Sequence, residues 1–364
     1  MKITAIEPIL IRVPYRHGGP RHSIGGISWT TMDTLLVRVA TDEGLVGWGE
    51  AFGYNAIPAT KAALETAVVP HCIGRECGAP AALAAELQQK LHNFGRGGAM
   101  VFALSGLDIA LWDIAGQAAG MPLHRLLGPA GKTRVPTYAS LLRYLEPALV
   151  ARNAAEAVER GYRHVKLHET NEAALKAARS AIGDKVALIV DTNCPWPFAE
   201  ALAMARRFAV YDLMWLEEPL WPPEDFAGLA RIQAESGVPL AAGENANAYA
   251  DFARMIEARA VTYLQPSVTK IGGLTELSRI VALARERKSA VIPHSPYFGP
   301  GLIATLHVIA ALEEEIPCER FYCDLEASPF GDAVVARHGF MAVPQGPGLG
   351  VEVDEAVIAR YRSD

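Results

Sequence analysis

Three acidic residues follow three short apolar segments at nearly equal intervals. Asp191 ends the segment ALIVD, Glu217 ends LMWLE and Glu244 follows PLAAG, so successive acids are 26 and 27 residues apart. If these segments are neighbouring parallel strands, two carboxylates about 4 Å apart at the sheet edge repel by about 4 kcal/mol at an effective dielectric of 20. A divalent cation would remove this repulsion, and oxygen ligands favour Mg²⁺ first and Mn²⁺ second. Spacing alone leaves open the alternative that each acid forms a separate salt bridge.

Three further residues could transfer protons. Lys166 and His168 are two positions apart in HVKLH, so a strand directs both side chains to the same side. Such a polar pair is costly to bury without a function, and a neighbouring ammonium favours a neutral His168 that can act as a base. His294 ends AVIPH and could serve the opposite face of a substrate as an acid or a base. The alternatives are a hydrogen bond from one member of the pair to the rim and a structural role for His294.

The pattern of segments predicts a barrel. From residue 135 onward, eight short apolar strands alternate with helical stretches, which is typical of βαβ units around a parallel sheet. The eighth predicted strand is FYCDLE, ending at Glu326. An open doubly wound sheet is disfavoured because no GxGxxG follows an early strand. We expect strands in the first 50 residues, helices from about 58 to 128, a barrel over 129–330, and a tail over 331–364 that packs on the N-terminal domain over 1–128.

A polar, glycine-containing loop is predicted between about Tyr15 and Thr30. Its Arg21 and His22 are candidate substrate-binding residues, because loops of this kind often act as lids over a site. The polar side chains suit a hydroxylated or dianionic substrate, although Ile27 and Trp29 weaken this inference. Simple solvation of the loop is the alternative.

The overall composition excludes several classes of protein. The 364 residues are 51% hydrophobic, enough for one large domain or two, and the net charge of −6 without a Lys/Arg run argues against a nucleic-acid surface. Five scattered cysteines without a CxxC pair predict neither a disulfide framework nor structural zinc, and favour a reducing cytoplasm. The first residues are typical of a strand, and no long uncharged apolar stretch predicts a membrane span.

Several motifs place the chain near a known family. The sequence SGLDIALWDIAGQAAGMPLHRLLG spans residues 105–128, followed in order by LEEP at 216–219, GEN at 243–245, KIGG at 270–273 and PQGPGLGVEVD at 344–354. Together they resemble the mandelate racemase and muconate lactonizing enzyme branch of the enolase superfamily. The resemblance implies a modified TIM barrel, (β/α)7β, and an α+β capping domain formed by both chain ends. It also implies that a base removes the α-proton of a carboxylate to give an enediolate, which Mg²⁺ stabilises.

The resemblance also implies roles for individual residues. It assigns Asp191, Glu217 and Glu244 to the metal, matches Lys166 and His168 to a Lys-x-Lys strand, and matches His294 to the histidine of a His-Asp dyad. Asn193 and Glu326 match residues that contact substrate, while Glu218 and Lys270 match residues that support the metal ligands.

Two positions depart from the family pattern. The second lysine of the strand is His168, and the partner aspartate of the dyad is replaced by Ser267. Without that aspartate His294 suits a general acid better than a base, which fits dehydration more closely than racemisation. Alternatively, Lys166 is the base and His168 only tunes it.

These observations favour a dehydratase that converts a sugar acid into a 2-keto-3-deoxy acid. The alternatives are a racemase, epimerase or lactone cycloisomerase acting on a hydroxy acid or sugar acid, and a barrel that binds metal and ligand without turnover. A glycoside hydrolase using Glu217 and Glu244 would work without metal. The expected partner is a small carboxylate, with no nucleic acid or membrane, and the family resemblance implies a homo-oligomer.

Overall fold

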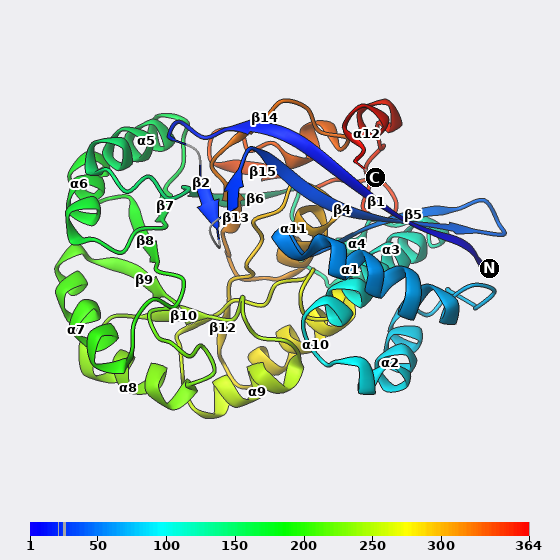
Figure 1. The fold of residues 1–364 in the computed structure, drawn as a ribbon, viewed down its shortest axis with the longest axis horizontal. Helices are drawn as coiled ribbons and strands as arrows, with labels where there is room; N and C mark the ends of the chain where they lie inside the picture. Colours follow the sequence, from blue (N-terminus) through cyan, green and yellow to red (C-terminus); the bar gives the residue numbers. More distant parts are fainter. Residues whose placement is uncertain (21, 25–26, 364) are drawn as a thin grey trace.

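Two large sheets organise the chain (Figure 1), and the hydrophobic core of the barrel extends onto one face of the smaller sheet, whose other face packs in a second core. The computed structural model describes residues 1–20, 22–24 and 27–363. The smaller sheet is antiparallel and has the order β14-β1-β4-β5, formed by β1 (Ile3–Arg16), β4 (Thr31–Thr41), β5 (Val46–Ala51) and β14 (Asp324–Leu325). Both chain ends lie at this sheet, because the Ser363 N–H donates to the Leu10 carbonyl of β1.

Helices cover one side of the small sheet and complete the cap. They are α1 (Ile57–Ala63), α2 (Pro80–Lys90), α3 (Ala99–Ala118) and α4 (Leu123–Leu127), with short turns η1 (Tyr54–Ala56), η2 (Leu64–Val68), η3 (Val69–His71) and η4 (His92–Phe94). Helix α3 packs closely on β5, since a Cβ at Gly49 would lie 1.8 Å from the Gly106 carbonyl oxygen. By length and composition α3 could cross a membrane, but 78% of its apolar window is buried, which is typical of a core helix.

The larger sheet is a parallel barrel sheet. Within residues 129–330, all of which the structure describes, eight parallel strands alternate with seven helices along the chain. The order of these strands across the sheet is β13-β6-β7-β8-β9-β10-β11-β12. The strands are β6 (Arg134–Ser140), β7 (His164–Leu167), β8 (Ala187–Asp191), β9 (Leu213–Glu217), β10 (Leu240–Ala242), β11 (Tyr263–Leu264), β12 (Ala290–Val291) and β13 (Cys318–Phe321). The predicted (β/α)7β fold with an α+β cap is therefore confirmed.

The helices lie outside the strands and bury one apolar face each (Figure 1). They are α5 (Pro147–Glu159), α6 (Glu172–Ile182), α7 (Phe198–Phe208), α8 (Phe226–Ser236), α9 (Tyr249–Glu257), α10 (Gly273–Glu286) and α11 (Pro300–Ala311), with η5 (Ala209–Tyr211) after α7. In α6 the side chain of Asn171 accepts from the Ala174 N–H at the start and Gly183 ends the helix. Its buried residues recur every three or four positions, so the helix has one face for the barrel.

The eighth strand lies earlier than the sequence predicted. It is CERF, which pairs with β6, whereas Asp324 and Leu325 form β14 and pair with β1 of the cap. This segment was not predicted as a strand because it contains the charged residues Glu319 and Arg320, whereas buried strands are expected to be apolar. Both are buried with partners: Glu319 contacts Lys166, and Arg320 donates to the Val334 carbonyl.

The predicted loop between Tyr15 and Thr30 is partly regular structure. Strand β1 continues to Arg16, and β2 (His22–Ile24) pairs with β3 (Ile27–Trp29) as a small hairpin. The tail contacts both parts of the chain: after η6 (Gly331–Val334), β15 (Phe340–Ala342) pairs with β6, and α12 (Glu355–Tyr361) packs against β1.

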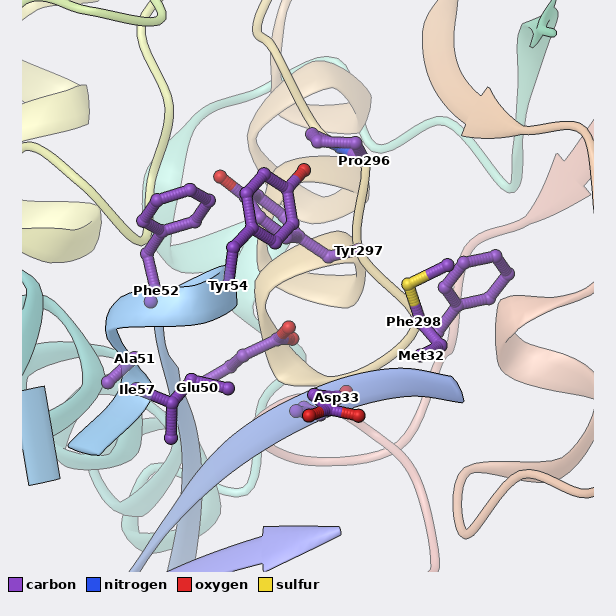
Figure 2. A pocket seen from close by; sticks show the side chains of 12 residues that line it. Met32, Asp33, Glu50, Ala51, Phe52, Tyr54, Ile57, Pro296, Tyr297 and Phe298 are labelled. Atoms are coloured by element: carbon purple, nitrogen blue, oxygen red, sulfur yellow. The ribbon is translucent and has the colours of Figure 1, made fainter. Parts of the chain in front are cut away.

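A buried carboxyl connects the cap to the barrel. Glu50 of β5 accepts the N–H of Gly301, in the first turn of α11, at 2.9 Å, and Figure 2 shows it in a small cavity with Tyr54 and Tyr297. Burial raises the pKa of Glu50 to about 7, although the Gly301 N–H opposes the shift. The carboxyl therefore binds its proton more tightly in the folded chain than in the unfolded chain.

We expect Glu50→Gln to change the pH dependence of stability. The contribution of a raised carboxyl pKa is fully present below the unfolded value of 4.5 and is lost as the pH rises to about 7. The stability of the variant relative to wild type should therefore increase between pH 5 and pH 8. The increase in the free energy of unfolding, variant minus wild type, should reach up to about 3 kcal/mol. Thermal unfolding at each pH measures it, and a constant difference would contradict the assignment.

Candidate active site

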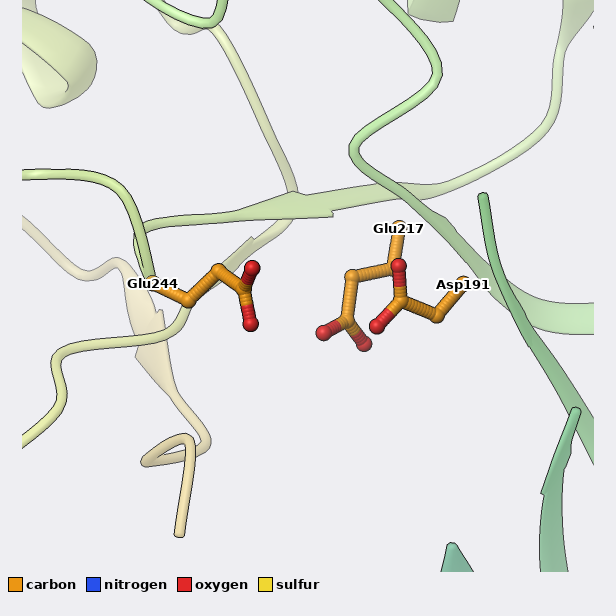
Figure 3. Close-up of side chains that lie close together, drawn as sticks. All are labelled: Asp191, Glu217 and Glu244. Carbon is orange, nitrogen blue, oxygen red and sulfur yellow. The ribbon is translucent and has the colours of Figure 1, made fainter. Parts of the chain in front are cut away.

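The three predicted metal ligands converge at the carboxyl ends of neighbouring strands. Asp191 ends β8, Glu217 ends β9 and Glu244 follows β10, and one carboxylate oxygen from each lies within 4.8 Å of the others. Figure 3 shows the three side chains directed toward a common space. Asp191 Oδ2 is buried and forms no hydrogen bond, although the Lys166 ammonium lies 3.1 Å away, and such an oxygen fits a cation ligand. This all-oxygen set supports Mg²⁺ binding.

Lys166 lies beneath these carboxylates and is fully buried. Its Nζ is 3.1 Å from Asp191 Oδ2, 2.8 Å from Glu217 Oε1 and 3.0 Å from Glu319 Oε1. Burial alone would lower the pKa of Lys166, but the surrounding carboxylates outweigh it and raise that pKa well above its usual range. Because Lys166 is enclosed by these carboxylates and does not line the cavity, it is suited to binding charge rather than to removing a proton from substrate.

The acids themselves are unequal in the absence of a metal. Burial and the neighbouring Asp191 raise the pKa of Glu217 well above its usual range, even though Lys166 and the Trp215 indole N–H both donate to it. Asp191 is the opposite case: burial opposes ionisation, but Lys166 and then His168 lower its pKa. One position in this crowded pair therefore favours a proton unless a further cation is present.

His168 borders the cavity with its Nε2 atom toward the metal ligands. Its Nδ1 lies 2.5 Å from the Leu141 carbonyl oxygen, so Nδ1 must carry a proton, while Nε2 lies 3.4 Å from Asp191 Oδ2. In the neutral ring this tautomer leaves the Nε2 lone pair available to the cavity. His168, not Lys166, therefore lies where a base can reach substrate.

His294 has a hydroxyl partner in the place of a carboxylate. Its Nδ1 lies 3.0 Å from Ser267 Oγ, Ser267 in turn shares a short hydrogen bond with Tyr297 Oη, and Nε2 lies 2.7 Å from Glu244 Oε2. A carboxylate cannot donate, so Nε2 carries a proton. The neutral ring then accepts at Nδ1 from the Ser267 hydroxyl. The histidines thus differ in how closely Nε2 approaches a carboxylate, at 2.7 Å for His294 and 3.4 Å for His168.

Glu319 occupies the position for which the sequence suggested Glu326. Glu319 is on β13, borders the cavity, and accepts from the Ser140 hydroxyl and the Ser295 N–H at 2.8 Å each. Glu326 is exposed and pairs with Arg360 and the Tyr361 hydroxyl, so the predicted substrate contact is wrong. The error follows from the late placement of the eighth strand.

Residues beside the triad have contacts of their own, and Asn193 bonds one of the three acids. Glu218 accepts from the Asn245 amide at 2.7 Å, and burial followed by nearby Glu244 raises its pKa to about 8. The backbone N–H of Asn193 donates to Asp191 Oδ1 at 2.9 Å. Glu218 and Asn193 both have positive φ, of 44° and 53°, a conformation that the strand ends impose at a cost of about 1 kcal/mol or more. The Lys270 ammonium lies 4.7 Å from the centre of the Phe52 ring.

The cavity above these groups has a volume of about 560 Å³. The cap contributes Phe52 and Tyr54, which follow β5, and the barrel contributes the remaining wall. The lining residues are Phe52, Tyr54, Leu142, Arg143, His168, Asn193, Cys194, Trp221, Pro223, Glu244, Asn245, Lys270, His294, Pro296, Glu319 and Phe321. The sequence did not single out the cap residues or Arg143. Arg21 lies outside the described residues, and for His22 the structure describes only the backbone, in β2.

Comparison with known proteins agrees with this geometry. The enolase C-terminal domain-like family model matches residues 149–357, and the mandelate racemase / muconate lactonizing enzyme N-terminal domain model matches residues 10–128. The chain therefore belongs to the mandelate racemase and muconate lactonizing enzyme branch of the enolase superfamily.

Individual relatives cover nearly the whole chain. A D-galactarolactone cycloisomerase from Agrobacterium fabrum is 31% identical, over 100% of this chain and 99% of that protein. An arabinonate dehydratase from Saccharolobus solfataricus is 30% identical over 93% of each chain. The structure of a racemase from Streptomyces coelicolor with bound magnesium superposes with a TM-score of 0.89 at 27% identity, covering 99% of this chain and 100% of that one.

Proposed function

We propose that this protein is a Mg²⁺-dependent dehydratase that converts a sugar acid into a 2-keto-3-deoxy acid. The observation that carries the proposal is the pair of histidines at one cavity: His168 bonds a backbone carbonyl through Nδ1 and borders the cavity, while His294 contacts Glu244 through Nε2. Dehydration needs one group that accepts the α-proton and another that donates to the leaving hydroxyl. The arabinonate dehydratase relative supports this assignment.

The residues of the chain divide the reaction between them. When bound at the triad, Mg²⁺ supplies positive charge that stabilises negative charge developing on the substrate carboxylate. Lys166 forms ion pairs with two of these acids, Asp191 and Glu217, so their carboxylates are positioned before substrate binds. His168 Nε2 takes the proton from the α-carbon, giving an enediolate. His294 Nε2 donates its proton to the β-hydroxyl, which leaves as water, and the resulting enol becomes the 2-keto acid.

The best alternative is a cycloisomerase that uses the same α-proton chemistry without net loss of water. The D-galactarolactone cycloisomerase relative favours it. In that reaction the bond broken at the β-carbon joins it to a lactone oxygen, and the product is an isomer of the substrate. Both reactions need the base, and they differ in the group that departs.

A library of sugar acids and their lactones separates these reactions. Each compound is incubated with enzyme and Mg²⁺, and 2-keto acid formation is followed by semicarbazide absorbance and proton NMR. A 2-keto-3-deoxy product from an open-chain acid, abolished by EDTA, is the expected result. Turnover of lactones alone, with isomeric products, would replace the proposal with the cycloisomerase.

We expect His294→Asn to separate the two proton transfers. Asparagine keeps a hydrogen-bond donor near Glu244 but cannot supply a proton, so 2-keto acid formation should fall by about 10²-fold or more, as for loss of a general acid. The α-proton should still exchange with solvent deuterium, because His168 is intact. Proton NMR in deuterium oxide measures both rates, and loss of exchange together with turnover would make His294 the base.

Further features belong to the same proposal. Mn²⁺ is expected to replace Mg²⁺ at the oxygen ligands. Asn193 is expected to contact substrate from the cavity wall, and a cytoplasmic homo-oligomer is the expected form of the enzyme.

A further inference from the structure

Arg143 is a cation on the cavity wall without an acidic partner among the described residues. Its Nε donates to the His168 carbonyl oxygen at 2.7 Å, and its Nη2 donates to Asn193 Oδ1 at 3.1 Å. Both acceptors are neutral. Arginines elsewhere on the surface commonly pair with acids, as Arg207 does with Glu172 at 2.6 Å.

The partners of Arg143 fix the guanidinium without neutralising it. Two of its five N–H groups are used, and Nη1 has no partner within the described part of the chain. The side chain is half-buried beside the cavity, so its charge is partly removed from water. A planar donor held in this way is suited to a carboxylate or phosphate, which it can bind through two parallel hydrogen bonds.

The other charged groups at the cavity already have partners. Glu319 pairs with Lys166, and Glu244 belongs to the metal triad and contacts His294. The Lys270 ammonium lies 4.7 Å from the centre of the Phe52 ring, so the aromatic face partly compensates its charge. Arg143 is therefore the wall cation whose charge has no counterpart among the described residues.

We propose that Arg143 binds a second anionic group of the substrate, distinct from the carboxylate at the metal triad. This inference rests on the proposed function, in which the first carboxylate lies at the triad. It narrows the substrate class to sugar acids with two anionic ends, either dicarboxylates or phosphorylated monocarboxylates. An aldonate of the same configuration, which ends in a neutral hydroxymethyl group, would leave Arg143 unpaired.

The test compares ligands that differ only at the end opposite the first carboxylate. A six-carbon aldarate, the aldonate of the same configuration and its terminal phosphate ester are measured with wild type, Arg143→Gln and Arg143→Lys in Mg²⁺. Calorimetry gives binding whether or not a compound turns over, and kcat and KM are measured for those that do. Arg163→Gln, an exposed arginine just before β7, is the matched control.

The expected result is selective loss of binding. Arg143→Gln should weaken binding of the dianionic ligand by about 30-fold or more, as for removal of one partner of a close charge pair. Its effect on the aldonate should be under about threefold, and Arg143→Lys should restore part of the loss. Preference of wild type for the aldarate over the phosphate ester identifies the group as carboxylate, and the reverse identifies it as phosphate.

Three outcomes would overturn the inference. Wild type could bind the aldonate as tightly as both dianions, Arg143→Gln could weaken all ligands equally, or no dianion could bind. If Arg143→Gln weakens binding of all ligands equally and also lowers kcat, Arg143 only positions His168. If a dianion binds in an Arg143-dependent way but no compound turns over, the binding site stands and the proposed dehydration fails.

Discussion

Asp191→Asn is expected to abolish catalysis by removing one charge from the metal triad. The amide retains shape and one oxygen, but it lowers the negative charge facing the cation and introduces an NH₂ donor beside the Lys166 ammonium. We expect Mg²⁺ affinity to fall by more than about 100-fold and kcat/KM by about 10³-fold or more, equivalent to about 4 kcal/mol. Calorimetry with Mg²⁺ and turnover of the best library substrate measure the two effects.

Glu326→Gln is the matched control for this prediction. It makes the same kind of change at an exposed acid whose partners are Arg360 and Tyr361, remote from the triad. Both Mg²⁺ affinity and kcat/KM should stay within about twofold of wild type, as expected of a surface pair. Full activity of Asp191→Asn in the presence of EDTA would be inconsistent with a metal site at the triad.

Lys166→Met is expected to destabilise the metal-free protein strongly. The substitution leaves Asp191, Glu217 and Glu319 buried together without their shared cation, and removal of one partner from such a group costs about 3–5 kcal/mol. Mg²⁺ should recover part of the loss, because it compensates two of the three acids. Thermal unfolding in EDTA and in saturating Mg²⁺ measures the recovery.

Two further variants interpret the Lys166 result. Lys61→Met removes a half-exposed lysine that lies 4.0 Å from Glu65, and its effect should be under about 0.5 kcal/mol. In saturating Mg²⁺, adding Glu319→Gln to Lys166→Met should restore stability. The metal then compensates Asp191 and Glu217, and the third acid, at position 319, has been made neutral. If Mg²⁺ stabilises wild type and Lys166→Met equally, the lysine and the metal do not share the same acids.

The barrel and its metal ligands could be predicted because regular spacing carries the information. Asp191, Glu217 and Glu244 each lie at or just beyond the end of an apolar strand, and parallel strands bring such ends together whatever the loops do. The roles of Lys166 and His168 could not be separated in this way. Both are on β7, and only the positions of the surrounding acids and the Leu141 carbonyl show which one is enclosed and which one borders the cavity.

Residues that depend on loop paths or on buried charge could not be predicted. Glu319 lies within a strand that contains two charged residues, and its burial is possible only because Lys166 approaches from another strand. Tyr297 reaches Ser267 across 30 positions of sequence through a loop whose path has no periodic signal. Arg143 follows the end of β6, and nothing in its local sequence indicates that its partners are neutral.

The division of the cavity wall between two parts of the chain has a practical consequence. Phe52 and Tyr54 come from a short stretch of the cap, whereas every acid of the triad comes from the barrel. Mutational libraries restricted to positions 52 and 54 would therefore alter the shape of the binding space and leave the reactive machinery intact. Changes at these two positions would act on the cap side of the cavity, whereas the charge of the accepted substrate would still depend on Arg143 of the barrel.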